Sequence, residues 1–164
     1  HGFSFNRAPY IKRQRADHAQ RWRPATHLDF PRAAVQPRAV QFPMKSEGGC
    51  HCGRVRFRVV VREPKALECN CSICEKKGFL HIIVPRDDFE LLSGDADLTT
   101  YTFNTGVAKH TFCKHCGVQS FYTPRSHPHM VDVNARCIDG NLIRELAIEP
   151  FDGENWEQNV ATIR

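Results

Sequence analysis

The sequence lacks the features of a membrane or secreted protein. No segment approaches the roughly 20 consecutive apolar residues that a membrane-spanning helix needs. The first residues show no charged start followed by an apolar run, as a secretory signal would. We therefore expect a soluble, cytoplasmic protein with no membrane partner. Apolar residues are not scarce overall, because 41% of the 164 residues are hydrophobic and 11 are Phe. A wholly disordered chain is thus excluded, and the length suits one ordinary domain.

An excess of charge is missing from most of the chain. Residues 44–164 carry 15 Lys and Arg against 16 Asp and Glu, whereas residues 1–43 carry eight against two. Phosphate contacts require clustered Lys and Arg, so we do not expect the folded part to bind nucleic acid. Residues 1–43 also hold five of the ten prolines and no cysteine. We expect them to form a basic, proline-containing leader of poor order, rather than an arm for nucleic acid or anionic lipid.

From residue 44 onward the pattern predicts a mainly β domain. Arginines alternate with apolar residues over 54–59, as in a strand that is buried on one face and solvated on the other. Further β-rich runs cover 79–84, 89–92, 98–103, 119–123 and 130–135, with turn signals at 94–95, 104–106 and 139–141. Only 71–77 and 155–161 look capable of a helical turn or two.

Seven of the eight cysteines fall into three clusters. They are Cys50 and Cys52, Cys113 and Cys116, and Cys69, Cys71 and Cys74, while Cys137 stands alone. Without signs of secretion, clustered thiols indicate metal ligands rather than a disulfide framework. A disulfide within a C-x-C pair would also close a strained ring.

Each of the two cysteine pairs can supply two of the four ligands of a zinc site. Glycines flank Cys50 and Cys52 and permit the bend that a C-x-C pair needs to aim both sulfurs at one ion, and Cys113 and Cys116 form a knuckle followed by Gly117. Zinc takes four tetrahedral ligands, so two such pairs make one closed structural site. Spacing alone leaves the pairing open, because the 69–71 pair can also join the 113/116 knuckle.

Cys69, Cys71 and Cys74, here called the triad, can hold a metal from three sides. An open fourth position is typical of a catalytic zinc, since water or substrate must bind there. The alternative is that a distant His51, His81 or His110 closes the site and makes it a second structural one. Spacing does not separate these two interpretations.

Other polar residues are weaker candidates. His81 and His110 have the chemistry of a general acid but are more typical of packed or surface positions. Lys76 and Lys77 follow the triad and can attract a substrate carboxylate, although a solvated surface is the more ordinary interpretation. We expect Cys137 to be a small buried core residue and not a ligand.

The order of the clusters resembles the glutathione-dependent formaldehyde-activating enzyme family. The resemblance lies in GCHCG at residues 49–53, CNCSIC at 69–74 and TFCKHCGVQ at 111–119. The stretches YTFNT at 101–105 and SFYTPRS at 120–126 are similar to its centromere protein V branch. The resemblance covers roughly residues 47–150 and is far more specific than a lone C-x2-C.

This resemblance implies a fold, two metal sites and a reaction for residues 44–164. The fold is Mss4-like, a zinc-stapled arrangement of β-sheets with little helix. Two zinc ions are implied, one structural and one catalytic with an open position. The structural ion would be held by Cys50, Cys52, Cys113 and Cys116, and the catalytic ion by Cys69, Cys71 and Cys74.

The implied reaction joins glutathione to formaldehyde and gives S-hydroxymethylglutathione, which is carbon–sulfur lyase chemistry. The implied partner is therefore a small thiol such as glutathione. The alternative function is a non-catalytic, zinc-binding chromatin-associated or scaffolding protein of the centromere protein V type. A third is a purely structural zinc module that binds another protein.

Overall fold

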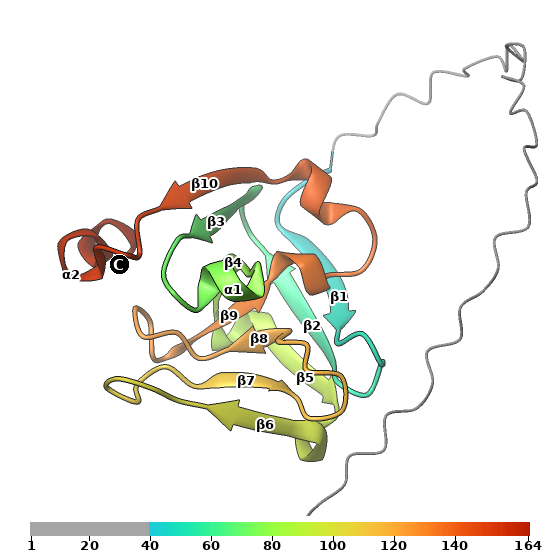
Figure 1. Ribbon diagram of the computed structural model, residues 1–164. Helices are drawn as coiled ribbons and strands as arrows, with labels where there is room; N and C mark the ends of the chain where they lie inside the picture. Colours follow the sequence, from blue (N-terminus) through green and yellow to red (C-terminus); the bar gives the residue numbers. More distant parts are fainter. Residues whose placement is uncertain (1–39) are drawn as a thin grey trace, which may run out of the picture. The chain divides into compact units, whose positions relative to one another are not determined.

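The computed structural model describes residues 40–164 (Figure 1). The expectation of a poorly ordered leader over residues 1–43 therefore falls almost entirely outside the described residues. Its last residues are described, and Phe42 packs against the main hydrophobic core. Within the described range no helix is long or apolar enough to cross a membrane.

The described residues are mainly β-strands, which confirms the expected mainly β fold with little helix. The strands are β1 (Met44–Gly49), β2 (Arg56–Val61), β3 (Lys65–Cys69), β4 (Leu80–Pro85), β5 (Phe89–Ser93), β6 (Leu98–Tyr101), β7 (His110–Cys113), β8 (Phe121–Tyr122), β9 (Met130–Asn134) and β10 (Ala147–Phe151). The α-helices are single turns, α1 (Cys74–Lys77) and α2 (Trp156–Asn159). Short 3-10 turns are η1 (Arg86–Asp88), η2 (Asp95–Asp97), η3 (Ala135–Cys137), η4 (Leu142–Glu145) and η5 (Val160–Ile163).

These strands form three sheets. One has the order β1-β2-β5, the largest has the order β10-β3-β4-β9-β8, and β6 pairs with β7 alone. Neighbouring strands are antiparallel except β3 and β10, which are parallel. Figure 1 shows β10 running alongside β3. This pairing sets Phe151 opposite Cys69 and brings the C-terminal segment against the triad.

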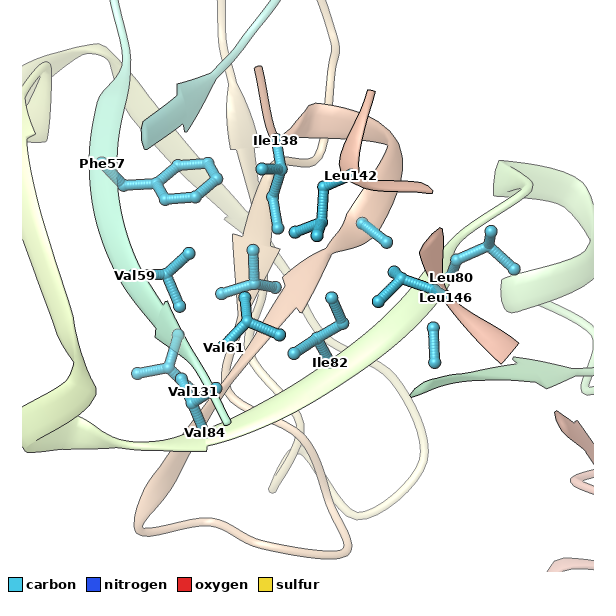
Figure 2. Close-up of a cluster of buried hydrophobic side chains, with 13 residues drawn as sticks. Phe57, Val59, Val61, Leu80, Ile82, Val84, Val131, Ile138, Leu142 and Leu146 are labelled. Carbon is cyan, nitrogen blue, oxygen red and sulfur yellow. The ribbon is translucent and has the colours of Figure 1, made fainter. Parts of the chain in front are cut away.

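The main core lies between β2 and one face of the largest sheet. Phe57, Val59 and Val61 of β2 are fully buried. Figure 2 shows them meeting side chains from β4, β9 and the chain after β9, namely Leu80, Ile82, Val84, Val131, Ile138, Leu142 and Leu146. Because successive side chains of a strand point to opposite faces, the odd-numbered residues of β4 and the even-numbered residues of β9 lie on the other face of this sheet. That second face is where the candidate site lies.

The arginines of β2 point away from the core, as their alternation predicts. Arg56 pairs with Asp139 at 2.5 Å, and Arg58 pairs with Glu47 at 2.8 Å and Glu90 at 2.7 Å. All of these carboxylates are exposed, so the arginine face is a solvated one and each pair contributes little to stability.

Some strands give no clear signal in the sequence. β1 ends in two glycines, which are poor strand formers in isolation. In the fold Gly48 packs against the Phe57 ring and the Cys137 carbonyl, where a Cβ atom would come within 2.5 Å and 2.3 Å of them. β10 is an edge strand that contains Pro150, and it is exposed over most of its length, so no apolar alternation marks it. Tertiary packing, not local pattern, forms both strands.

Phe57→Ala should destabilise the domain by about 3–5 kcal/mol, because it removes a fully buried ring from a close-packed core. The ring packs against Phe89 and Phe121 with centroids 5.7 Å and 6.0 Å away. The matched control is Arg58→Ala on the next position of the same strand, which should cost less than about 1 kcal/mol. Denaturant unfolding of the metal-replete proteins measures both changes. Equal losses would contradict the placement of the core.

Candidate metal centres and their cavity

The structure brings Cys50, Cys52, Cys113 and Cys116 together into a first cluster. Their sulfur atoms all lie within 4.8 Å of one another. The Sγ atom of Cys52 is 3.5 Å from that of Cys50 and 3.7 Å from that of Cys113. Sulfurs bound tetrahedrally at 2.3 Å from one zinc ion are about 3.8 Å apart. The four side chains therefore fit a four-thiolate zinc site, and the triad does not take part in it.

Two tight turns aim these sulfurs at a common point. Gly53, at φ 78°, donates its amide to the Cys50 carbonyl at 3.1 Å, and Gly117, at φ 74°, donates to the Cys113 carbonyl at 2.8 Å. Both glycines adopt the left-handed conformation that other residues rarely take. Cys50 follows β1 and Cys113 ends β7, so the first cluster joins two different sheets.

The surroundings of two thiols of the first cluster favour the thiolate, the form that binds metal. At Cys52 a backbone hydrogen bond lowers the pKa, but desolvation and the neighbouring cysteines outweigh it and raise the pKa of this thiol. Desolvation works against ionisation of Cys116, but the Val118 backbone amide and the neighbouring cysteines lower its pKa to about 6. Burial likewise opposes ionisation of Cys50, yet the Val55 amide, 3.4 Å from its sulfur, helps to lower the pKa of that thiol.

The triad forms a second cluster at the end of β3. Cys69 is the last residue of β3, Cys71 lies in the following loop, and Cys74 begins α1. The sulfurs of Cys69 and Cys74 and a ring nitrogen of His81 lie within 4.8 Å of one another. Hydrogen bonding with the Cys69 and Cys74 thiols lowers the pKa of Cys71. The structure thus brings one of the three histidines considered from sequence, His81, together with Cys69 and Cys74, while the Cys71 sulfur is not part of that group of atoms.

The C-terminal segment packs closely on the triad. The Asn70 amide donates to the Phe151 carbonyl at 3.3 Å. A Cβ atom at Gly153 would lie 2.3 Å from the Cys69 sulfur and 3.1 Å from the Cys71 Cβ atom. The position accepts only glycine for reasons of space. Sequence reasoning missed this residue, since one glycine in a polar stretch carries no distinctive signal.

His81 lies on the second face of the largest sheet and is 7% exposed. Its Nδ1 atom is 2.7 Å from a carboxylate oxygen of Asp132, which is 1% exposed on the neighbouring strand β9. Burial opposes protonation of His81, but the Asp132 carboxylate outweighs it and raises the pKa of the imidazole. The Nε2 atom has no hydrogen-bond partner among the described residues. Asp132 was not a candidate from sequence, although a carboxylate within the apolar run MVDVN is itself unusual.

A cavity of about 340 Å³ opens beside the triad. Its floor is the second face of the largest sheet, where His81, Tyr122 and Asp132 lie. Its wall includes Phe103 and the buried His110. The volume is in the range of small-molecule sites, which are mostly apolar with a few polar groups. The cysteines of the first cluster do not line it.

Aromatic rings are stacked in a column from the surface to the cavity floor. Phe103 stacks on His110 with centroids 5.3 Å apart, and His110 stacks on Tyr122 at 4.9 Å. Tyr101, 51% exposed, continues the column outward on Phe103. Burial lowers the pKa of His110 and so favours the neutral ring, and its Nε2 atom has no partner among the described residues. Both histidine candidates therefore line the cavity.

The lysine candidate Lys77 lies outside the cavity. An arginine that the sequence analysis did not consider, Arg125, lines it. Lys77 bonds Gln119 and lies over the Phe112 ring at 5.9 Å, outside the cavity. Arg125 lines the cavity with its guanidinium 4.8 Å over the Trp156 ring, and it also bonds Glu157.

Cys137 and Lys76 both lie outside the two cysteine clusters. Cys137 is half-buried against the main core, rather than fully buried, and it belongs to neither cluster. Lys76 is exposed, as the ordinary interpretation of a solvated surface holds.

Comparisons with known proteins agree with this arrangement. The profile of the glutathione-dependent formaldehyde-activating enzyme family matches residues 45–158, which include all three cysteine clusters. A Halomonas elongata protein, provisionally named a glutathione-dependent formaldehyde-activating enzyme, is 32% identical over 110 residues, 62% of this chain and 70% of its own. A crystal structure of a Rhodobacter sphaeroides protein superposes with a TM-score of 0.58 at 34% identity, covering 63% of this chain and 97% of the other. The chain therefore belongs to the glutathione-dependent formaldehyde-activating enzyme family.

Proposed function

We propose that the protein is a zinc-dependent carbon–sulfur lyase-like enzyme that joins glutathione to formaldehyde and forms S-hydroxymethylglutathione. The observation that carries the proposal is the position of the triad, whose three cysteines all line a cavity of about 340 Å³. Membership of the family and the name of the Halomonas relative support the choice of glutathione and formaldehyde.

The two cysteine clusters suit different roles. The first cluster offers four protein sulfurs, which complete a tetrahedral site and leave no position for a substrate. It also joins two sheets, so we assign it a structural zinc. The triad offers three sulfurs from one short segment and faces the cavity, so we assign it a catalytic zinc.

Zinc held by the triad would lower the pKa of an incoming thiol and place the thiolate beside an electrophilic carbonyl. In the reaction the thiol loses its proton, a carbon–sulfur bond forms, and the formaldehyde oxygen gains a proton as its double bond opens. Phe103, His110 and Tyr122 provide a stacked aromatic wall for the bound reactants. Arg125, at the Trp156 end of the cavity, has the charge and fork geometry to hold a carboxylate of glutathione. This carboxylate would share or replace the present contact of Arg125 with Glu157.

Substitution of zinc by cobalt tests the proposal, because thiolate ligands of cobalt give absorption bands that depend on the ligand set. We expect two cobalt ions per chain, and we expect glutathione to change the spectrum of one of them while the other stays the same. Affinity should rise with pH towards the pKa of the glutathione thiol, since the entering ligand must lose its proton. Two ions that both ignore glutathione would contradict the proposed function.

A further inference from the structure

We propose that His81 is the fourth ligand of the triad metal in the resting protein, that Asp132 holds it in place, and that an entering thiol replaces it. The inference rests on the proposed function for the presence of zinc at the triad. It goes further in assigning a resting ligand, a positioning residue and an exchange step. The resting site would then hold three sulfurs and one nitrogen, not an open position.

One ring nitrogen of His81 has no hydrogen-bond partner among the described residues. The side chain is 7% exposed and its Nδ1 atom is taken by Asp132, so Nε2 is the atom left free. Buried polar atoms of native proteins almost always have a partner, and the polar groups of residues 40–164 supply none for this nitrogen. A ring nitrogen of this residue lies within 4.8 Å of the Cys69 and Cys74 sulfurs. A metal ion between them satisfies the free nitrogen.

The Asp132 carboxylate holds the other nitrogen of the His81 ring. Histidines that bind metal commonly donate their other N–H to a carboxylate, which fixes the tautomer and the ring orientation. Asp132 provides this contact at 2.7 Å and is 1% exposed. Adjacent antiparallel strands fix the pair, because Asp132 of β9 lies opposite Ile83, two residues beyond His81 on β4. A buried carboxylate is costly unless it is paired, so its role here is to position His81.

His110 provides a matched comparison within the same cavity. It is 4% exposed, and its Nε2 atom also has no partner among the described residues. Unlike His81, it does not converge with the cysteines, and it is stacked between Phe103 and Tyr122. A histidine can thus be buried in this cavity without lying among the cysteines, so burial alone does not make His81 a metal ligand.

The exchange is balanced as a ligand substitution. The bond between the metal and Nε2 breaks, the bond between the metal and the thiol sulfur forms, and the thiol proton leaves to solvent. A neutral imidazole adds no charge to a zinc ion that already has three thiolates, whereas an incoming thiolate adds one negative charge. His81 thus closes the site at rest without further charge and leaves it available to a thiol.

Cadmium NMR of the full chain tests this directly, since the cadmium shift changes strongly when nitrogen replaces sulfur. In cadmium-loaded protein with nitrogen-15-labelled histidine, we expect two cadmium resonances, one of which is coupled to an imidazole nitrogen. His81→Ala should remove the coupling and shift that resonance alone. His110→Ala should change neither. Because the coupling is measured in the unsubstituted chain, the test does not depend on the folding of a variant.

Asp132→Asn tests the positioning role by a separate readout. The variant should keep the nitrogen coupling but bind the second metal about 10–100-fold more weakly in competition with a chelator, while the first cluster keeps its affinity. Unchanged affinity of both sites would overturn the role of Asp132.

Glutathione separates the failure of this inference from failure of the proposed function. Both are supported if glutathione abolishes the nitrogen coupling and moves that resonance towards the four-sulfur position. A second resonance with no nitrogen coupling before thiol is added overturns the inference and leaves the proposed function standing. A nitrogen coupling that persists in excess glutathione overturns the exchange step and the proposed function together.

Discussion

Cys113→Ser is expected to leave the protein unfolded or aggregated. Cys113 is 1% exposed and its sulfur lies 3.7 Å from that of Cys52, in the cluster that joins β1 to β7. Binding of a structural zinc is worth about 10–16 kcal/mol in small zinc modules, whereas an ordinary domain is stable by about 5–15 kcal/mol. Loss of most of that binding energy is comparable to the whole stability of an ordinary domain, so we do not expect the fold to survive it. Thermal melting together with zinc content measures the effect.

The matched control is Cys137→Ser, which changes the same atom outside both clusters. This variant should bind as much zinc as the unsubstituted chain, and its melting temperature should be close to that of the unsubstituted chain. A Cys113→Ser protein that melts at the same temperature as the Cys137→Ser control would show that the first cluster is not structural.

Cys71→Ser is expected to abolish activity and leave a folded domain. Cys71 is half-buried in the loop between β3 and α1, and it packs in a small cluster with Cys69, Cys74 and Phe151 that is separate from the main core. Serine removes one of three sulfurs, so the second metal binds more weakly and the thiol loses its site. The rate of S-hydroxymethylglutathione formation should fall to the rate without protein, with a circular dichroism spectrum like that of the unsubstituted chain.

Ser72→Ala is the control for this loop, because Ser72 is adjacent, exposed and has no sulfur. It should retain both the second metal and the activity. If Cys71→Ser lowers the melting temperature as much as Cys113→Ser, the division into structural and catalytic sites is wrong.

Period-two patterns predicted the strands that bury one face, and they failed where tertiary pairing makes the strand. β2 follows the alternation over 54–59, shifted by two residues, and β4, β5 and β9 lie within two residues of their predicted runs. β3, β7 and β10 were missed. β10 is an exposed edge strand that pairs in parallel with β3, β3 lies between β10 and the antiparallel β4, and β7 is a short strand that pairs with β6. The order of strands in the sheets has no local signal at all.

Spacing predicted the three cysteine clusters but not which of them meet, and the pairing of the first two was implied only by the family resemblance. Their pairing depends on β1 and β7 approaching each other, and this is decided by packing between sheets. His81 was one of three histidines considered, and only the register of β4 and β9 sets it beside Asp132. Carboxylate and imidazole lie 51 residues apart in the chain. No spacing rule connects them.

The alternative function, a chromatin-associated or scaffolding protein, stays a prediction from the sequence. Neither the family description nor the name of the Halomonas relative refers to chromatin. The proposal of an enzyme and that alternative differ in whether the cavity beside the triad turns over a substrate.

The central claim is that the triad and its cavity join a thiol to formaldehyde. Stopped-flow mixing of glutathione and formaldehyde, followed by loss of the thiolate absorbance, tests it with zinc-replete full-length protein. We expect catalytic amounts of the protein to accelerate this loss, and we expect removal of the second zinc by a chelator to abolish the acceleration. A rate equal to that of the two reactants alone, in protein that holds both zinc ions, would contradict it.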